Sequence, residues 1–219
     1  YMLDCVFLVP IDHRGIQGKL FPQYLELQSW CEKNNSRIFT CNGLFLNFAR
    51  NYLATGGKGM ADTSPPECKW LFWIDSDIAF KIEQIETLLS MPDKYRFLNG
   101  WYRSAFDDNA MCGMWDKEFF DKHQYMPFLS VKDLTKKGEK DPKSVIQVDF
   151  SGFGFTRLDA NIISEMTYPY FTLNVVNLGQ YRDMSFDDVS FCQNCEKETG
   201  VKPFVMPALR VGHNKSFFV

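Results

Sequence analysis

The chain has 219 residues, of which 45% are hydrophobic and 16% aromatic, and its formal net charge is −3. This composition excludes a disordered chain, because disordered chains are poor in aromatic residues and cannot bury enough apolar surface to fold. The negative charge excludes a nucleic-acid partner held by bulk electrostatics, although a few local cations and backbone amides can still bind a small anion. No run reaches the roughly 20 apolar residues of a membrane-spanning helix, so we expect no transmembrane segment.

The first half of the chain alternates apolar runs with helical patterns. Strands are expected at 5–11, 37–41 and 69–75, and helices at 22–35, 44–54 and 82–91. In the first helix the spacing directs Leu25, Leu27 and Trp30 inward. This β-α-β-α-β-α order is typical of a parallel sheet with helices on its faces.

The second half changes character. Strands are expected at 95–103, 108–118 and 202–213, and residues 144–158 are expected to form a strand that runs into a glycine-rich turn. Helices are expected at 159–168 and 187–200, the last ended by Gly200. Residues 131–144 are polar and charged without an apolar period, which predicts a mobile surface loop. No linker divides the chain, so we expect one α/β domain over 1–219 with a mixed, mostly parallel central sheet.

Seven cysteines, an odd number at irregular spacing, predict reduced thiols in a reducing compartment, the cytoplasm. Cys192 and Cys195 form a lone CxxC pair. A zinc site needs four ligands, and no second pair follows at suitable spacing. We therefore expect these two cysteines to share one helix face, with at least one of them buried.

Acidic residues follow the most apolar strand. In an open α/β sheet, ligands bind beyond the carboxyl ends of the strands, where the sequence places Asp12, Arg14, Asp75 and Asp77. Asp75 and Asp77 lie about 6–7 Å apart on an extended chain, and two unpaired carboxylates beside an apolar core are costly. A divalent cation removes that repulsion: oxygen ligands suit Mg²⁺ or Mn²⁺, and His213 would favour Mn²⁺. The alternative is that both acids cap a turn or helix.

The stretch FWIDSD (72–77) resembles the D-x-D motif of GT-A glycosyltransferases, which use nucleotide sugars. Four further segments are similar to parts of that family in the same order, and the resemblance covers roughly 4–215. They are NGLFLNFARNYLA (42–54), DFSGFGFTR (149–157), FDD (186–188) and GHNK (212–215). The chain as a whole also resembles glycosyltransferase domains encoded by large chlorella viruses.

The resemblance implies a role for each segment. Arg50 would reach the nucleotide or diphosphate, and Gly152 and Gly154 would face the donor sugar and the acceptor. Asp188 would act as base, with Asp187 beside it and Asp149 as a rival. The metal shell would comprise Asp75, Asp77 and His213. Further donor contacts would come from Pro10, Asp12, Arg14, Asp75, Ser76 and Lys215.

These residues also have structural interpretations. Arg50 could be a surface or salt-bridged residue, and the two glycines could mark a bulge or a turn with positive φ. One acid of the Asp187–Asp188 pair could cap the following helix. The rings of Trp101, Tyr102 and Trp115 could belong to the core or stack on a sugar.

The function implied is transfer of a hexose or deoxyhexose, of the glucose or rhamnose type, from a UDP-sugar to a glycan or glycoprotein acceptor. Such an acceptor could be a viral capsid glycoprotein, in the host cytoplasm. Residues 1–103 would form the nucleotide-binding half, and residues 104–219 the acceptor and catalytic half. With Asp188 as base the product would invert, and without a carboxylate there it would retain configuration.

Two other functions stay open. A nucleotidyltransferase could use similar acids on a similar sheet, but VPIDHRGIQGK lacks the spacing of a glycine- and lysine-rich phosphate loop. A non-catalytic nucleotide- or sugar-binding module would need neither the metal nor Asp188.

Overall fold

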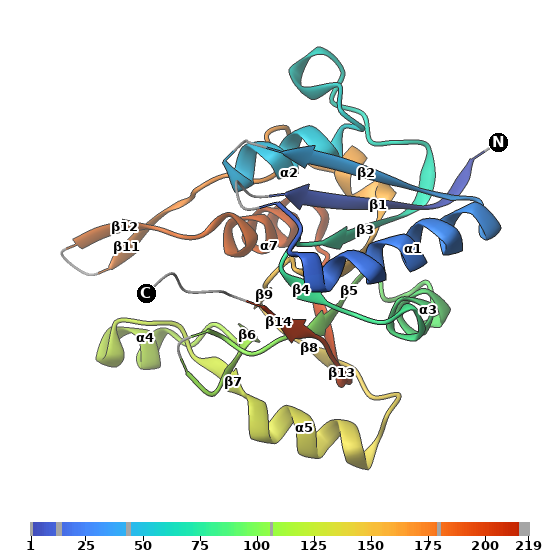
Figure 1. The fold of residues 1–219 in the computed structure, drawn as a ribbon. Coiled ribbons are helices and arrows are strands. Elements are labelled where there is room, and N and C mark those ends of the chain that lie inside the picture. The colour runs from blue at the N-terminus through green and yellow to red at the C-terminus, as the bar shows by residue number, and fades with distance from the viewer. Residues whose placement is uncertain (1, 12–14, 43–44, 106, 179–180, 215–219) are drawn as a thin grey trace.

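The structure is a computed structural model that describes residues 2–11, 15–42, 45–105, 107–178 and 181–214. A seven-stranded sheet in the order β2-β1-β3-β10-β5-β13-β8 forms its centre (Figure 1). Its strands are β1 (Leu3–Ile11), β2 (Ser36–Asn42), β3 (Cys68–Ile74), β5 (Phe97–Trp101), β8 (Ile146–Gln147), β10 (Phe155–Asp159) and β13 (Phe204–Arg210). β10 is antiparallel to β3 and β5 and β8 is antiparallel to β13, while the other neighbours are parallel. This confirms the expected mixed, mostly parallel α/β sheet.

Helices cover both faces of the sheet. The described helices are α1 (Phe21–Lys33), α2 (Leu46–Ala54), α3 (Ile82–Ser90), α4 (Lys117–His123), α5 (Val131–Lys140), α6 (Ala160–Glu165) and α7 (Asp187–Thr199), with 3-10 turns at Gly18–Leu20 and Gly59–Ala61. Two core clusters flank the central sheet: one contains side chains of α1 and α3, and the other contains side chains of α2, α6 and α7. A third, smaller cluster contains Leu134 of α5 with Trp101 and Val205. No helix in the described part of the chain is both long and apolar enough to cross a membrane.

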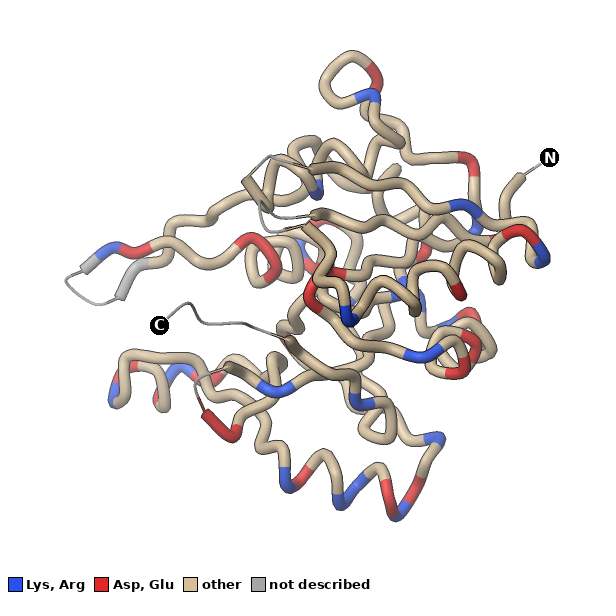
Figure 2. Tube along the Cα trace, in the orientation of Figure 1, with Lys and Arg blue, Asp and Glu red and all other residues tan. Residues whose placement is uncertain are grey.

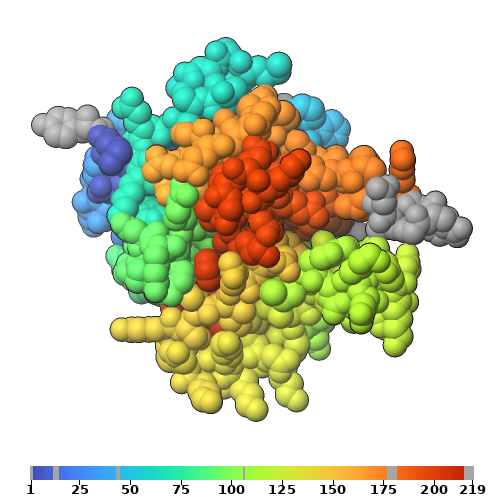
Figure 3. Space-filling model, turned by 180° about the vertical axis from the view of Figure 1, so that it is seen from behind, coloured from blue at the N-terminus to red at the C-terminus, as the bar shows by residue number. Residues whose placement is uncertain are grey.

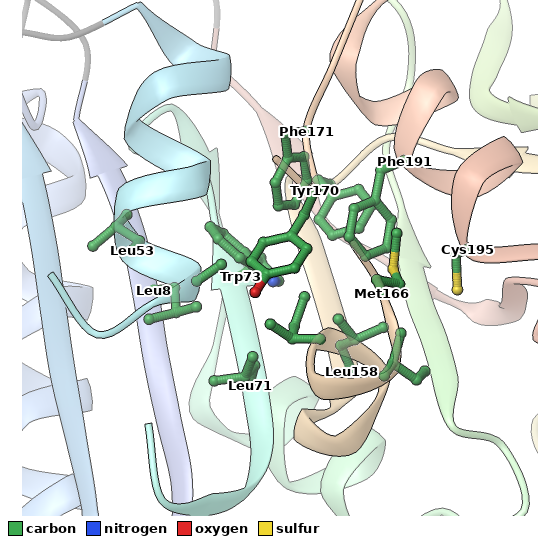
Figure 4. Close-up of a cluster of buried hydrophobic side chains, with 14 of the residues drawn as sticks. Leu8, Leu53, Leu71, Trp73, Leu158, Met166, Tyr170, Phe171, Phe191 and Cys195 are labelled. Atoms are coloured by element: carbon green, nitrogen blue, oxygen red, sulfur yellow. The ribbon is translucent and has the colours of Figure 1, made fainter. Parts of the chain in front are cut away.

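The two clusters explain the unbroken apolar runs of the central strands. Successive side chains of a strand point to opposite faces, so Phe72 lies in the cluster of α1 and α3 while Leu71 and Trp73 lie in the other. Figure 4 shows the second cluster, in which Trp73 packs among side chains from α2, α6 and α7. Because both faces of β3 are buried, its residues Trp70 to Ile74 are all apolar, and Asp75 and Asp77 follow only after the strand has ended.

Three smaller sheets complete the fold. β6 (Asn109–Gly113) pairs with both β7 (Phe128–Ser130) and β9 (Phe150–Ser151), and β11 (Val175–Leu178) pairs with β12 (Tyr181–Met184) in a projecting hairpin (Figure 1). β4 (Ile78–Ala79) pairs with β14 (Gly212–His213). Because β10 is antiparallel to β3, its amino end lies at the same edge as the carboxyl end of β3.

Several local expectations were wrong. The predicted loop 131–144 is largely helix α5, in which Ser130 accepts a hydrogen bond from the amide of Asp133 and Leu134 is buried. Its charged residues of both signs lie along the outer side (Figure 2), so the apolar face is too narrow to give a clear period. The expected strand 108–118 ends at Gly113, and α4 follows with Asp116 as its cap. Leu25 is 57% exposed, whereas Leu27 is buried as predicted.

The seven cysteines are free and buried. Cys192 and Cys195 both lie in α7 and belong to the same core cluster, as the expected helix face requires. Gly200 ends α7 in the left-handed conformation with φ 73°, which glycine adopts without strain.

Candidate active site

A tight turn carries Asp75, Ser76 and Asp77 from β3 into β4. The amide of Asp75 donates to the carbonyl of Gly154 at 3.1 Å, and the carbonyl of Asp75 accepts from the amide of Ile78 at 3.0 Å. The Tyr24 hydroxyl donates to the same carbonyl at 3.3 Å. The two acids are therefore held at the carboxyl edge of the sheet by backbone bonds.

Arg50 connects this turn to the start of α7. The side chain of Arg50 is 2% exposed; one terminal nitrogen donates to Asp187 at 2.8 Å and the other to both oxygens of Asp75 at 2.9–3.0 Å. The rings of Phe153 and Phe171 lie 5.6 and 5.8 Å from its guanidinium carbon. Burial opposes the charge of Arg50, but Asp75 and Asp187 outweigh it and raise the pKa of Arg50. The Arg50 guanidinium is thus ion-paired with Asp75 and Asp187, in agreement with the alternative that Arg50 is a salt-bridged residue.

The acids around Arg50 are themselves perturbed. Burial raises the pKa of Asp75, with Arg50 acting against the shift and Asp77 adding to it. Burial also raises the pKa of Asp188 to about 6, again against Arg50 and with help from Asp187. A carboxylate with a pKa near the working pH is suited to accept a proton as a general base.

The helix that carries Asp187 and Asp188 has no side-chain cap. Its N-cap residue is Phe186, so the expectation that one of the acids caps α7 was wrong. Asp187 binds Arg50 instead, and Asp188 accepts a hydrogen bond from the next amide, Val189, at 2.8 Å. Both acids lie in the first helical turn, where the helix dipole favours negative charge.

His213 lies beside Asp77. Pairing of β14 with β4 sets His213 opposite Ile78, and its Nε2 is 3.5 Å from a carboxylate oxygen of Asp77. Its Nδ1 lies 3.2 Å from the carbonyl of Arg103. A proton on Nδ1 donated to that carbonyl leaves the Nε2 lone pair for a metal, the usual arrangement of a ligating histidine.

The protein supplies only part of the ligand set that Mn²⁺ or Mg²⁺ requires. Asp77 supplies oxygen and His213 supplies nitrogen, a combination that suits Mn²⁺, whereas Asp75 faces Arg50. Within the residues that the structure describes, no three His, Cys, Asp or Glu side chains are grouped to enclose a metal. A cation held by Asp77 and His213 would therefore need phosphate oxygens or water as further ligands.

Tyr102, whose ring the sequence assigned either to the core or to sugar stacking, is buried and forms a wall of the site. Its hydroxyl accepts a hydrogen bond from the amide of Gly154 at 3.3 Å, and its ring lies 4.8 Å from that of His213. Burial, with Asp75 and Asp188 nearby, raises its pKa. A Cβ on Gly152 would overlap the Tyr102 hydroxyl, and one on Gly154 would lie 2.7 Å from the ring. The absence of side chains at both positions therefore makes room for the Tyr102 ring. This requirement could not be read from the sequence, because it depends on where Tyr102 lies in the fold.

A pocket of about 380 Å³ adjoins His213 and is lined also by Arg103, Ser104 and Arg210. The two arginines favour an anion in this pocket, with the Arg103 guanidinium also paired with Asp108 at 3.0 Å. These arginines were not among the residues expected from the sequence, because cations on the surface are common and no motif marks them.

The remaining expected residues lie in different places. Pro10 is near the carboxyl end of β1, opposite Cys41 of β2. Asp149 has other partners than Arg50: its carboxylate accepts from Lys202 at 2.7 Å and from the amide of Trp115 at 2.6 Å. Trp101 and Tyr102 are buried, whereas Trp115 is 46% exposed. Asp12, Arg14 and Lys215 lie outside the described residues.

Comparison with known proteins adds evidence on the fold. No protein-family model matches the sequence, and no curated protein matches it. Among solved structures, A197 from STIV is 13% identical with a TM-score of 0.56, over 98% of this chain and 87% of that chain. GalNAc-T7, solved with UDP, GalNAc and Mn²⁺, is 12% identical with a TM-score of 0.56, over 99% of this chain and 44% of that chain.

A glycosyltransferase involved in glycosylation of the major capsid of PBCV-1 also matches, at 12% identity and a TM-score of 0.36, over 96% of this chain and 82% of that chain. The match to GalNAc-T7 and the mixed sheet with helices on both faces define a GT-A-like fold, which confirms the fold expected from the sequence. The chain spans less than half of the GalNAc-T7 chain.

Proposed function

We propose that this protein is a metal-dependent glycosyltransferase that moves a hexose or deoxyhexose from a UDP-sugar to a glycan acceptor. The observation that carries the proposal is the meeting of Asp75, Asp77 and His213 at the carboxyl edge of a GT-A-like sheet, where Arg50 ties Asp75 to Asp187, the neighbour of Asp188. The similar fold of GalNAc-T7, solved with UDP, GalNAc and Mn²⁺, supports a nucleotide-sugar donor and a divalent cation. An acceptor on a viral capsid glycoprotein, and a cytoplasmic location, extend the proposal from the resemblance.

Asp77 and His213 would hold the cation, which would act as a Lewis acid on the charge that develops on the leaving diphosphate. Arg103 and Arg210 would attract the phosphates from the adjoining pocket, with Lys215 and Arg14 as further cations. Ribose and base would contact the turn at Ser76 and the end of β1 at Pro10 and Asp12. Gly152 and Gly154, which make room for the Tyr102 ring, would shape the donor-sugar site through that ring.

Asp188 would take the proton of the acceptor hydroxyl. As the hydroxyl oxygen bonds to the anomeric carbon, the bond from that carbon to the diphosphate breaks and UDP leaves. A pKa of about 6 keeps most Asp188 ionised at neutral pH while leaving it basic enough to accept the proton. Attack opposite the leaving group would invert the anomeric configuration. Arg50 would hold Asp75 and Asp187 in place, in accordance with its burial, and would not itself touch the donor.

The test is UDP release from UDP-glucose and UDP-rhamnose with Mn²⁺ or with EDTA. Asp77→Asn and Asp188→Asn should each lower the rate by about 100-fold or more, because the first loses a ligand of the cation and the second loses the general base. Asp93→Asn, a change at an exposed acid paired with Lys69, is the matched control and should leave the rate unchanged.

Full activity of Asp77→Asn, or equal activity in EDTA, would contradict the proposal. Release of pyrophosphate from a nucleoside triphosphate would favour a nucleotidyltransferase instead. Binding of UDP without turnover of any donor would favour the non-catalytic module.

A further inference from the structure

A second pocket, of about 420 Å³, lies along one side of α7. Its lining combines apolar with polar side chains: Trp115, Phe150, Met126 and Val189, and Asp149, Gln193, Glu196 and Lys202. Seen from behind, α7 is at the surface, with the segment around 115–126 and the chain near 149 beside it (Figure 3). Its volume falls within the range of small-molecule sites, and the proposed reaction leaves it without a role.

Trp115 offers this pocket an apolar surface. The residue is 46% exposed, and its ring packs against the buried Phe120 with centroids 5.2 Å apart. Its amide donates to Asp149 at 2.6 Å, which ties the segment to the wall of the pocket. An indole that is half exposed yet held in place is suited to stack against a flat apolar ligand face, such as that of a pyranose ring.

The polar side chains form a connected row. Lys202 donates to Asp149 at 2.7 Å and lies 3.1 Å from Glu196, and these bonds raise the pKa of Lys202. Each carboxylate can accept further hydrogen bonds, and the amide of Gln193 can both donate and accept. Sugar hydroxyls also donate and accept. Because the row holds two carboxylates and one ammonium group, it favours a neutral ligand over a phosphate or a nucleotide.

The pocket leads toward the candidate base. Val189, Gln193 and Glu196 recur at helical spacing along one side of α7 and line the pocket, and Val189 directly follows Asp188. A glycan in the pocket would therefore run along α7 toward its amino end, where Asp188 lies.

We propose that this pocket is the acceptor subsite and that it takes a neutral hexopyranose of the acceptor glycan. The assignment as acceptor rests on the proposed function, whereas the binding of a sugar does not. It also gives Asp149 a place in acceptor binding and not in proton transfer.

The test is saturation-transfer NMR on the whole chain with the methyl glycosides of glucose, galactose, mannose and rhamnose. At least one should bind, and Trp115→Ala should weaken it at least fivefold. Phe21→Ala, at a residue 52% exposed at the start of α1, is the control and should bind as the wild type does. Methyl glucuronide, which carries a negative charge, should bind more weakly than methyl glucoside.

The same samples are melted with UDP and Mn²⁺. Trp115→Ala should keep the full shift with UDP, because the donor site is elsewhere. No binding of any of the four glycosides, or equal binding by Trp115→Ala, would overturn the subsite. Sugar binding that depends on Trp115 without a UDP shift would retain the sugar site and refute the proposed function. If Trp115→Ala does not fold, Gln193→Ala carries the same expectation.

Discussion

Arg50 joins parts of the chain that are far apart in sequence: it contacts Asp75, 25 residues away, and Asp187, 137 residues away. Removal of such a buried cation leaves two carboxylates without a partner. Arg50→Met should therefore lower the free energy of unfolding by about 3–5 kcal/mol, measured by urea denaturation at pH 7.

Arg96→Met provides the control for this prediction. Arg96 also bridges two acids, Asp159 and Glu165, but its side chain is partly exposed, so its loss should cost about 1 kcal/mol or less. Equal losses for the two variants would show that Arg50 is no more than a surface ion pair.

Asp188 should destabilise the protein at neutral pH. Its folded pKa is about 6 and its unfolded pKa about 3.9, so the folded state binds the proton more tightly. The stability gained from this tighter proton binding is fully present below about pH 4, where Asp188 is protonated in both states. It is lost as the pH rises through about 6, where the folded protein must bury the ionised carboxylate. Asp188→Asn is neutral throughout and should be more stable than the wild type at pH 8, by about 1–2 kcal/mol, a gain of the kind seen when a functional strain is removed.

Thermal melting from pH 4 to 8 measures this difference, which should vanish near pH 4. Asp187→Asn is the contrast, because it weakens a pair with Arg50 and should lower stability at pH 7. If Asp188→Asn were less stable than the wild type at pH 8, the ionised Asp188 carboxylate would not be destabilising, and this prediction would be wrong.

At the scale of elements, the segment from β9 to β10 is shaped by one aromatic ring. Gly152→Ala would collide with the hydroxyl of Tyr102, whereas Gly154→Ala would collide with its ring carbons. Each should cost about 1–3 kcal/mol, as is typical of overpacking. Tyr102→Phe should recover part of the loss in Gly152→Ala but none in Gly154→Ala, because only the first collision involves the oxygen.

A double-mutant cycle in urea measures both couplings. The same coupling for both glycines would mean that the ring as a whole moves, contrary to the contacts described above.

The elements that sequence predicted best are those buried on both faces, such as β1 and β3, because their apolar runs have few other interpretations. α5 was missed because Leu134 and Gly138 are its only buried residues among ten, too few to show a helical period. The turn at Asp75 and Asp77 was found from its place after a buried strand. The partners of Arg50 and the ring behind Gly152 could not be found, since both depend on contacts between distant segments.

At the scale of the whole molecule, two core clusters on opposite faces of one sheet leave its carboxyl edge as the place where polar residues gather. The class of fold followed from the order of strands and helices, whereas the insertion of β10 between β3 and β5 did not, because pairing order is not written in local periodicity. That insertion carries Gly154 to the turn at Asp75, and α7 and β14 bring Asp188 and His213 to the same edge.

The most direct measurement is thermal melting with UDP, in Mn²⁺ and in EDTA. At about 100 times its Kd, UDP should add about 2.7 kcal/mol, or roughly 5–10 °C for a chain of this size. The account predicts this rise only with Mn²⁺, and its loss in Asp77→Asn. No rise with UDP in Mn²⁺, or the same rise in EDTA, would contradict a metal-dependent nucleotide-sugar site at Asp77 and His213.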